Sequence, residues 1–513
     1  MNKLLYALVA SFSTQIVYAD ITTESSVITS SSASAIKPIQ IESAPQLESA
    51  LAAPTANTNS TYISNVAYIQ NPYAGVTSGG GTLVPQQKVM ESEGLLGKLF
   101  TNGTYNVYSG ATTGFGGTGK NGSSGETSAY GATLFAQTGQ VGGFSFGGAF
   151  TAMNPFFASN MNGSNMNDNL FTPGNQQLAL TQAFLEYQYE NILNADVGYI
   201  AINNSPWLSA SYYNDMISVP ATYQGALLNV YPGGGWLLTA LAFNGVQTSG
   251  QEGFTGETFY NSIYGSSYQT NNASSNGTVA LGANFVGWNN NYNLRLWGYQ
   301  FDDYGTMLYG DNSIKIPLSK AVTLNFAGQG GVNNNFGANT AFTNNPYAVE
   351  PSSSYLPSSG NINSKFAGAQ AGVTVDWFNA TFSANTVWGP SDAVGNGAIV
   401  TPYTTNLGTD PLYAEGWLTT MANSGLTGNI YKASLTFSFL DNNLSINPNY
   451  VTLSSADPYW NGTQEVFITV NYSIPQVKGL FLFGVFAYQW TPQANPVNGS
   501  NDWTSSIVTS YLW

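Results

Sequence analysis

The side chains that most often carry catalysis are missing from this sequence. Its 513 residues include no cysteine and no histidine. A disulfide, a thiolate site, a histidine-ligated metal and a nucleophilic site of the Ser-His-Asp or Cys-His type are therefore excluded. A catalytic pair of carboxylates remains formally possible, but no local group of acidic residues suggests one. We expect no enzymatic activity, no cofactor and no metal.

Charged side chains could still act on ions and solutes, but they are few in this sequence. Only 7% of the residues are charged, and 26 acidic against 11 basic residues give a formal net charge of −15. Glu186, Arg295 and Lys432 each lie on the polar face of a segment in which polar and apolar residues alternate. Asp215 lies in a predicted loop. Such charges attract or repel small ions and solutes, an effect that salt weakens.

The alternation itself must position these charges, and it recurs from about residue 101 to residue 513. It is clearest in the segments 378–388, 431–439 and 466–473. Alternation with a period of two predicts strands, and about 9–11 tilted residues are enough to span a bilayer. The chain also contains 11 Trp, 32 Tyr and 28 Phe. Aromatic residues at strand ends are typical of the girdles at membrane interfaces.

The connections between these segments are alternately short and long. The short ones are 137–140, 190–194, 231–235, 288–291, 441–443 and 475–478, and the long ones are about 153–176, 204–219, 246–275, 332–362 and 389–426. The pattern falters at Asp302 and Asp303, where an outer loop would be very short, and the strand pattern is weakest near 304–317. Tight turns on one side and long loops on the other predict an all-β protein, a transmembrane antiparallel barrel of about 18 strands. Both termini would be periplasmic.

The start of the chain predicts export. Residues 1–19 resemble a signal peptide, with Lys3, an apolar run and a small-x-small cleavage site ending at Ala19. Residues 20–100 are rich in Ser, Thr, Ala and Pro and predict a flexible periplasmic segment, either a tether or an element that enters the pore. Within it, 87–100 is compatible with one short helix. Residues 101–513 then form the barrel.

The last segment predicts how the barrel is completed. Trp503, Ile507, Tyr511 and Trp513 share one face of a terminal alternating strand. Such a strand would close the barrel against the first one and remove both exposed edges. A terminal aromatic resembles the signal read by the bacterial outer-membrane assembly machinery. We therefore expect that machinery, through Trp513, and outer-membrane lipids as partners, in a protein that is either a monomer or a trimer.

Two stretches resemble the OprD-type outer-membrane porins. In 194–207 and 214–228, a strand ending in glycine leads to a proline-containing loop and then to a Met-x-Pro-like segment that starts the next strand. The matching residues are Pro206, Asp215, Pro220, Thr222, Tyr223, Gln224 and Gly225, and a second match is Lys478, Gly479 and Leu480. The resemblance implies an 18-stranded, substrate-preferring channel with loops folded into its lumen, including the loop before Pro220. The basic residues typical of that lumen are not matched, because Arg295 is the one arginine and Ile217 stands where the family usually has another.

These observations predict a porin of the bacterial outer membrane. It would form a water-filled channel for passive diffusion of small polar solutes or ions, with a mild cation preference and a constriction at 204–219. An arginine in the lipid midplane costs about 2–4 kcal/mol, so Arg295 should face the lumen. There, Arg295, Lys432 and Glu186 either set selectivity or merely solvate the wall and pair with one another. Asp215 either attracts cations or is an exposed loop carboxylate. The alternative function is a β-rich surface-layer or adhesin-type structural protein.

Overall fold

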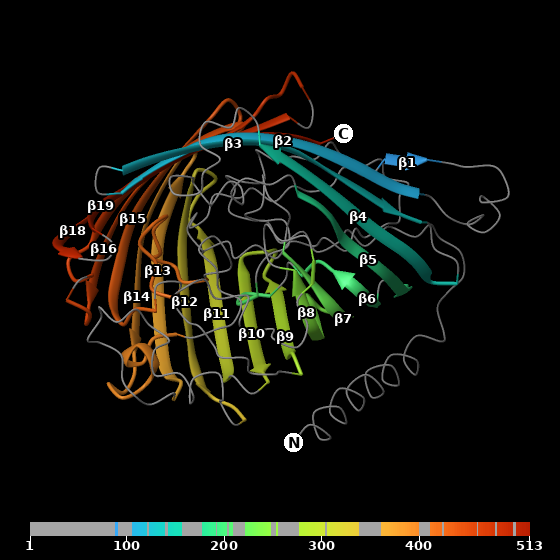
Figure 1. Ribbon diagram of the computed structural model, residues 1–513, viewed down its shortest axis with the longest axis horizontal. Coiled ribbons are helices and arrows are strands. Elements are labelled where there is room, and N and C mark those ends of the chain that lie inside the picture. The colour runs from blue at the N-terminus through green and yellow to red at the C-terminus, as the bar shows by residue number, and fades with distance from the viewer. Residues whose placement is uncertain are drawn as a thin grey trace.

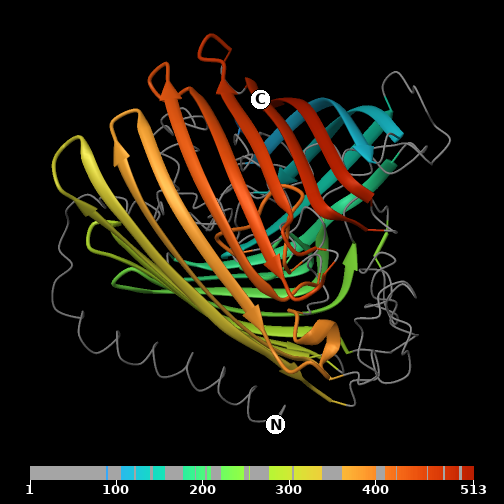
Figure 2. The same ribbon diagram turned by 90° about the vertical axis from the view of Figure 1, so that its left-hand side faces the viewer.

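The protein is one antiparallel β-sheet rolled into a closed ring (Figures 1 and 2). The computed structural model describes residues 88–90, 105–120, 123–138, 142–155, 177–190, 192–202, 205–208, 221–247, 253–254, 276–302, 305–337, 361–399, 411–422, 425–458, 460–477, 480–495 and 499–512. No helix in these ranges has the length and apolarity needed to cross a membrane.

In the described ranges, nineteen strands make up the sheet, and one short 3₁₀ helix lies outside it. The bounds are β1 Lys88–Met90, β2 Tyr105–Lys120, β3 Ser123–Gln137, β4 Phe144–Pro155, β5 Gln177–Tyr189, β6 Leu193–Ile200, β7 Thr222–Gly233, β8 Trp236–Gln247, β9 Thr278–Gly287, β10 Tyr292–Phe301, β11 Gly305–Pro317, β12 Val322–Asn335, β13 Asn363–Val375, β14 Phe378–Trp388, η1 Val394–Asn396, β15 Gly428–Phe439, β16 Leu444–Ser455, β17 Gln464–Ser473, β18 Leu480–Asn495 and β19 Gly499–Leu512.

Closure is made by the first and last long strands. Each strand from β2 to β19 pairs with its neighbours in sequence, and β19 pairs in turn with β2, from Asp502↔Lys120 to Leu512↔Gly110. Figure 2 shows the red C-terminal strands beside the blue N-terminal ones. The 18 strands that remain when β1 is left out of the 19-stranded sheet therefore form a ring without an exposed edge, as the sequence predicted. The short strand β1 pairs with the start of β2.

The two faces of strands such as β14 and β17 differ as the alternation predicted. In β14, Phe382 and Trp388 are 55% and 45% exposed, whereas Ser383 and Asn385 are buried. The same alternation is found in β17, where Val466 is exposed and its neighbours in sequence are buried. Exposed apolar side chains and buried polar ones reverse the arrangement of a water-soluble protein. They fit a barrel whose outside faces lipid and whose inside is polar.

The connections follow the predicted pattern in part, because the rim with the long loops also carries the short connections 121–122 and 496–498. One rim, here called the turn rim, carries short connections such as 190–192, 234–235, 288–291 and 440–443, and the opposite loop rim carries 156–176, 201–221, 248–277, 336–362 and 389–427. The very short connection expected on the loop rim lies at 302–304. The weakly patterned region after it is nevertheless a regular strand, β11. The start of β2 and the end of β19 both lie at the turn rim, because Asn106 pairs with Gln137 and Leu512 with Gly110.

The segment before the barrel differs from the expectation of a helix. Within 87–100, residues Lys88–Met90 form strand β1 and continue the sheet beside β2. The physical reason is that β2 offers free backbone donors and acceptors beyond its ladder with β19, which an extended segment can pair with. The predicted signal peptide 1–19, the rest of 20–100 and Trp513 lie outside the described residues.

Candidate functional site

Two segments that belong to no strand lie buried inside the ring. The first is 205–208, from the connection between β6 and β7, and the second is 411–422, from the connection between β14 and β15. Both come from long connections of the loop rim. Trp207 in the first segment and Tyr413 in the second are fully buried. Loops that fold inward in this way narrow the lumen of a barrel.

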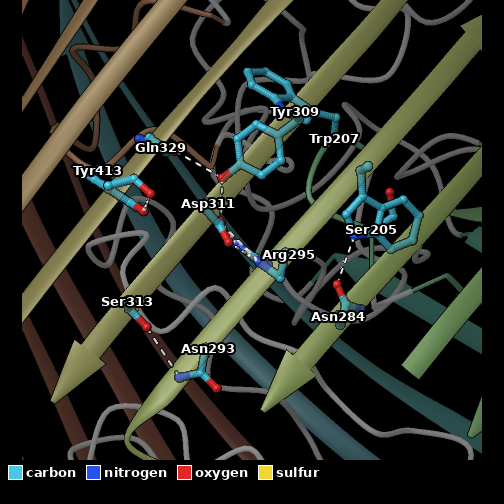
Figure 3. A network of polar contacts seen from close by, with 12 residues as sticks. Ser205, Trp207, Asn284, Asn293, Arg295, Tyr309, Asp311, Ser313, Gln329 and Tyr413 are labelled. Atoms are coloured by element: carbon cyan, nitrogen blue, oxygen red, sulfur yellow. Dashed lines mark hydrogen bonds and ion pairs between the residues drawn. The ribbon is translucent and has the colours of Figure 1, made fainter. Parts of the chain in front are cut away.

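The first inward segment contacts the wall beside the Arg295 network, where Figure 3 shows Ser205 and Trp207. The hydroxyls of Ser205 and Tyr299 are 3.0 Å apart, and the backbone N–H of Trp207 donates to the Tyr299 hydroxyl at 3.4 Å. The Trp207 ring meets Tyr309 and Phe366 edge-on, with centroids 5.9 and 5.4 Å apart. A chain leaving β6 is therefore fixed to side chains of β10, β11 and β13. The described part of this connection, which includes the buried Pro206, therefore lies inside the ring.

Arg295 faces the interior, as predicted, but its charge is compensated. It lies directly across the β10–β11 ladder from Asp311. Its Nε donates to both carboxylate oxygens of Asp311, at 2.9 and 3.0 Å, and its terminal guanidinium nitrogen makes a third contact. The Tyr309 hydroxyl also donates to Asp311, at 2.6 Å. Both charges are buried, so this pair forms part of the wall.

The second inward segment joins the same network through an amide. The amide of Gln329, on β12, has one orientation in which both its atoms find hydrogen-bond partners. In that orientation, its nitrogen donates to the carbonyl of Pro411 at 2.8 Å and its oxygen accepts from the N–H of Tyr413 at 2.8 Å. The Asn385 oxygen accepts from the N–H of Ala414, also at 2.8 Å. The segment is therefore hydrogen-bonded along the wall from β12 to β14. Figure 3 shows Gln329 and Tyr413 beside the Arg295 network.

Lys432 also faces inward, and it contacts the same segment. Its Nζ donates to the backbone carbonyl of Glu415 at 2.9 Å, and the side chain is 1% exposed. The Glu415 carboxylate in turn accepts from the N–H of Met421 at 3.0 and 2.8 Å. Lys432 thus lies under the inward segment and helps to hold it, rather than standing alone on an open lumen wall.

Glu186 is inward-facing as well, and it has an acidic neighbour. It lies directly across the β5–β6 ladder from Asp196, close to the turn rim, and both carboxylates are buried. The Ser145 hydroxyl donates to Glu186 at 3.2 Å. Among the described residues, the buried charged side chains are two basic, Arg295 and Lys432, and five acidic, Glu186, Asp196, Asp311, Glu415 and Glu465. The electrostatic balance inside this part of the barrel is therefore negative.

The segment that resembles the porin family opens strand β7. Thr222 and Tyr223 are fully buried, and Tyr223 packs on Phe243 with ring centroids 4.6 Å apart. The ladder between β7 and β8 is irregular at Gly225. A Cβ there would lie 2.2 Å from the Ala242 carbonyl oxygen, so the close backbone approach requires glycine. Asp215 and Pro220 lie outside the described residues.

Sequence reasoning missed most of the partners of the predicted charges. Asp311, Gln329 and Glu465 all have the lumen-facing phase of their strands, so the argument used for Arg295 would have placed them inside. Which of them meet depends on strand register and on the path of the inward loops, neither of which alternation specifies. Among the described residues, no group of three acidic side chains is arranged to hold a metal ion.

Solved structures with the same architecture were found across most of the chain. The outer membrane protein opdK of Pseudomonas aeruginosa is 14% identical with a TM-score of 0.59, and the match covers 79% of this chain and 98% of that one. OccK9 (OpdG) of the same organism is 14% identical with a TM-score of 0.61, covering 80% and 98%. A BenF-like porin from Pseudomonas fluorescens Pf-5 is 12% identical with a TM-score of 0.61, covering 80% and 98%.

The chain has the fold of these outer-membrane porins. The predicted fold class and the predicted resemblance to the OprD-type porins are thereby confirmed at the level of structure. Neither a protein-family model nor a curated protein matches the sequence. At identities of 12–14%, the likeness establishes the architecture, and the identity of the solute must be argued from the residues of this chain.

Proposed function

We propose that the protein is a non-enzymatic channel of the bacterial outer membrane, through which small polar solutes or ions diffuse passively. The observation that carries this proposal is the closed ring with an apolar outside, an interior in which polar and charged side chains lie beside a hydrophobic cluster, and two segments folded into that interior. Closure satisfies every backbone group within lipid, while the inward segments restrict what passes. The fold shared with outer-membrane porins supports the same conclusion.

Within that function, we propose a mild preference for cations. Five buried acidic side chains against two basic ones support a negative lumen, and the one described guanidinium is neutralised by Asp311. A negative potential raises the local concentration of cations. Asp215 is proposed to add to it, in the 204–219 connection that we infer to be the constriction.

The solutes proposed for this chain differ in charge from the molecule present in one structure with a similar fold. A structure of Pseudomonas aeruginosa OpdK was determined with vanillate, an aromatic carboxylate. This lumen has a buried excess of acidic groups, which would repel such an anion. Uncharged or cationic polar solutes therefore fit this chain better. The alternative of a surface-layer or adhesin-type protein gives no reason for loops folded inside a sealed ring.

The function can be tested with purified protein in liposomes. Proteoliposomes should swell in isotonic solutions of small uncharged sugars and should not swell with large ones, as for a sieving pore. The protein should also fractionate with the outer membrane and migrate differently on a detergent gel before and after boiling. Impermeable proteoliposomes that contain correctly folded, heat-modifiable protein would contradict the channel and favour a structural role.

A further inference from the structure

We propose that Glu465 is the positioning residue that holds the inward segment 411–422 inside the barrel and thereby sets the width of the pore. This inference rests on the channel function proposed above. It concerns a wall carboxylate whose partner is the backbone of the segment. Glu465 lies near the start of β17, on the lumen face, and is fully buried.

The Glu465 carboxylate is surrounded by backbone donors from three consecutive residues. One oxygen accepts from the N–H of Trp417 at 2.8 Å and of Leu418 at 3.1 Å. The other accepts from Leu418 at 3.1 Å and from Thr419 at 2.7 Å. Successive N–H groups that converge in this way form an anion-binding nest. Hydrogen bonds to an ionised acceptor are roughly twice as strong as neutral ones.

The inward segment is shaped to admit this carboxylate. The N–H of Gly416 donates to the carbonyl of Thr419 at 2.8 Å, which closes a tight turn around the three donors. A Cβ at Gly416 would lie 2.2 Å from an oxygen of Glu465. Glycine therefore leaves the space that the carboxylate occupies. Turn and side chain fit each other, as expected of an anchor point.

Other contacts also hold the inward segment, but they do not involve the three N–H groups that donate to Glu465. The Gln489 side chain donates to the Thr419 hydroxyl at 2.9 Å, and the Trp417 ring stacks on Phe483 with centroids 6.0 Å apart. Neither contact reaches the three N–H groups. Removing the carboxylate would leave these donors, of which that of Thr419 is buried and the other two are part-buried, without their acceptor, which is costly. The segment is then expected to leave the wall so that its donors reach water.

The chemistry predicts an unusual ranking of substitutions. Each carboxylate oxygen accepts two hydrogen bonds, so an amide in the same place would turn its NH₂ group toward N–H donors. Glu465→Gln should therefore release the segment almost as Glu465→Ala does, despite its nearly identical size. Thr469→Val is the matched control, because Thr469 is a buried, lumen-facing residue of the same strand whose hydroxyl has no hydrogen-bond partner.

The test is single-channel conductance in planar bilayers, with folding verified by heat modifiability. Glu465→Ala and Glu465→Gln should raise conductance by about twofold, as when an element that narrows a pore withdraws, and Thr469→Val should match the wild type. Replacing chloride by acetate should restore the lower conductance of Glu465→Ala, because acetate can occupy the vacant nest. It should not restore Glu465→Gln, whose side chain fills that space. Rescue by acetate separates the anchoring role from a general loss of structure.

Each failure has a distinct meaning. A folded wild-type protein that does not conduct would overturn the channel itself. If the wild type conducts, and the folded Glu465→Ala and Glu465→Gln variants have the same conductance as the wild type, only the role of Glu465 is overturned. If the Glu465 variants do not assemble, Gly416→Ala provides the test, because its methyl group displaces the carboxylate without removing the charge. It should raise conductance in the same direction, and unchanged conductance would again contradict the inference.

Discussion

At the scale of single residues, Arg295 and Asp311 behave as one unit of the wall. Each is buried, and each is the other's direct cross-strand partner. Breaking a buried pair by removing one member costs about 3–5 kcal/mol, because the remaining charge is left uncompensated. Arg295→Met and Asp311→Leu should therefore each lower the urea concentration at which the refolded barrel unfolds.

The double substitution provides the control for this prediction. The variant with both Arg295→Met and Asp311→Leu should recover most of the lost stability, because no buried charge is left alone. Arg295→Lys should not recover it, since an ammonium cannot reproduce the forked contact. Single variants as stable as the wild type would show that the pair is solvated instead of being enclosed by the inward segments.

The facing carboxylates Glu186 and Asp196 should contribute to ion preference. Because they lie opposite each other near the turn rim, Glu186→Gln removes charge from the most acidic part of the described wall. We expect the reversal potential in a salt gradient to move toward anions, and to move less at high ionic strength. Thr469→Val serves as the uncharged control. An identical reversal potential in Glu186→Gln would place the pair outside the path of the ions.

Residue orientation was predictable from the sequence, and residue partnership was not. The phase of alternation placed Arg295, Lys432 and Glu186 inside, because a charge on the lipid face is costly. It could not show that Arg295 meets Asp311, since a two-residue shift in register keeps every face and changes every neighbour. Nor could it show that Lys432 donates to the carbonyl of Glu415, which lies 17 residues earlier in the sequence, in the inward segment 411–422.

At the scale of elements, strand β7 depends on one close approach. Gly225→Ala should lower the yield of folded barrel, because its Cβ would lie 2.2 Å from the Ala242 carbonyl oxygen and 2.5 Å from Phe243 Cβ. Gly298→Ala is a suitable control, since the atom that its Cβ would meet is the end of the Leu308 side chain, at 3.4 Å. The folded fraction is measured as the heat-modifiable band after refolding. Equal yields of the two variants would contradict the requirement for glycine in β7.

The strands themselves were predictable because residues that face lipid and residues that face the interior alternate along each strand, and this alternation is visible in the local sequence. Segment 378–388 was predicted with the bounds that β14 has, and the short turn at 288–291 likewise joins β9 to β10. The inward loops were less predictable, because their buried apolar residues, such as Leu208, Leu412 and Met421, stand among polar ones without a regular period. A helix within 87–100 was the wrong expectation for Lys88–Met90, where pairing with β2 decides the structure.

At the scale of the whole molecule, closure of the ring depends on β19 meeting β2. Ile507, on the outer face of β19, is 55% exposed and fits a lipid-facing strand. Deleting Trp513 should reduce insertion into the outer membrane and increase periplasmic degradation, because the terminal aromatic is proposed to be read by the assembly machinery. Membrane fractions and degradation products measured side by side would test this. Normal insertion of the shortened chain would show that Trp513 is no signal.

The central claim is that this closed ring is a water-filled channel with a mild preference for cations. Its most direct test is the conductance of the purified wild-type protein in a planar bilayer, followed by the reversal potential across a salt gradient. A cation-preferring channel should give discrete conductance steps and a reversal potential of the sign expected for cation selectivity, and this selectivity should decrease as salt rises. Absence of steps from folded protein would contradict the channel, and strong anion selectivity would contradict the proposed electrostatics of its lumen.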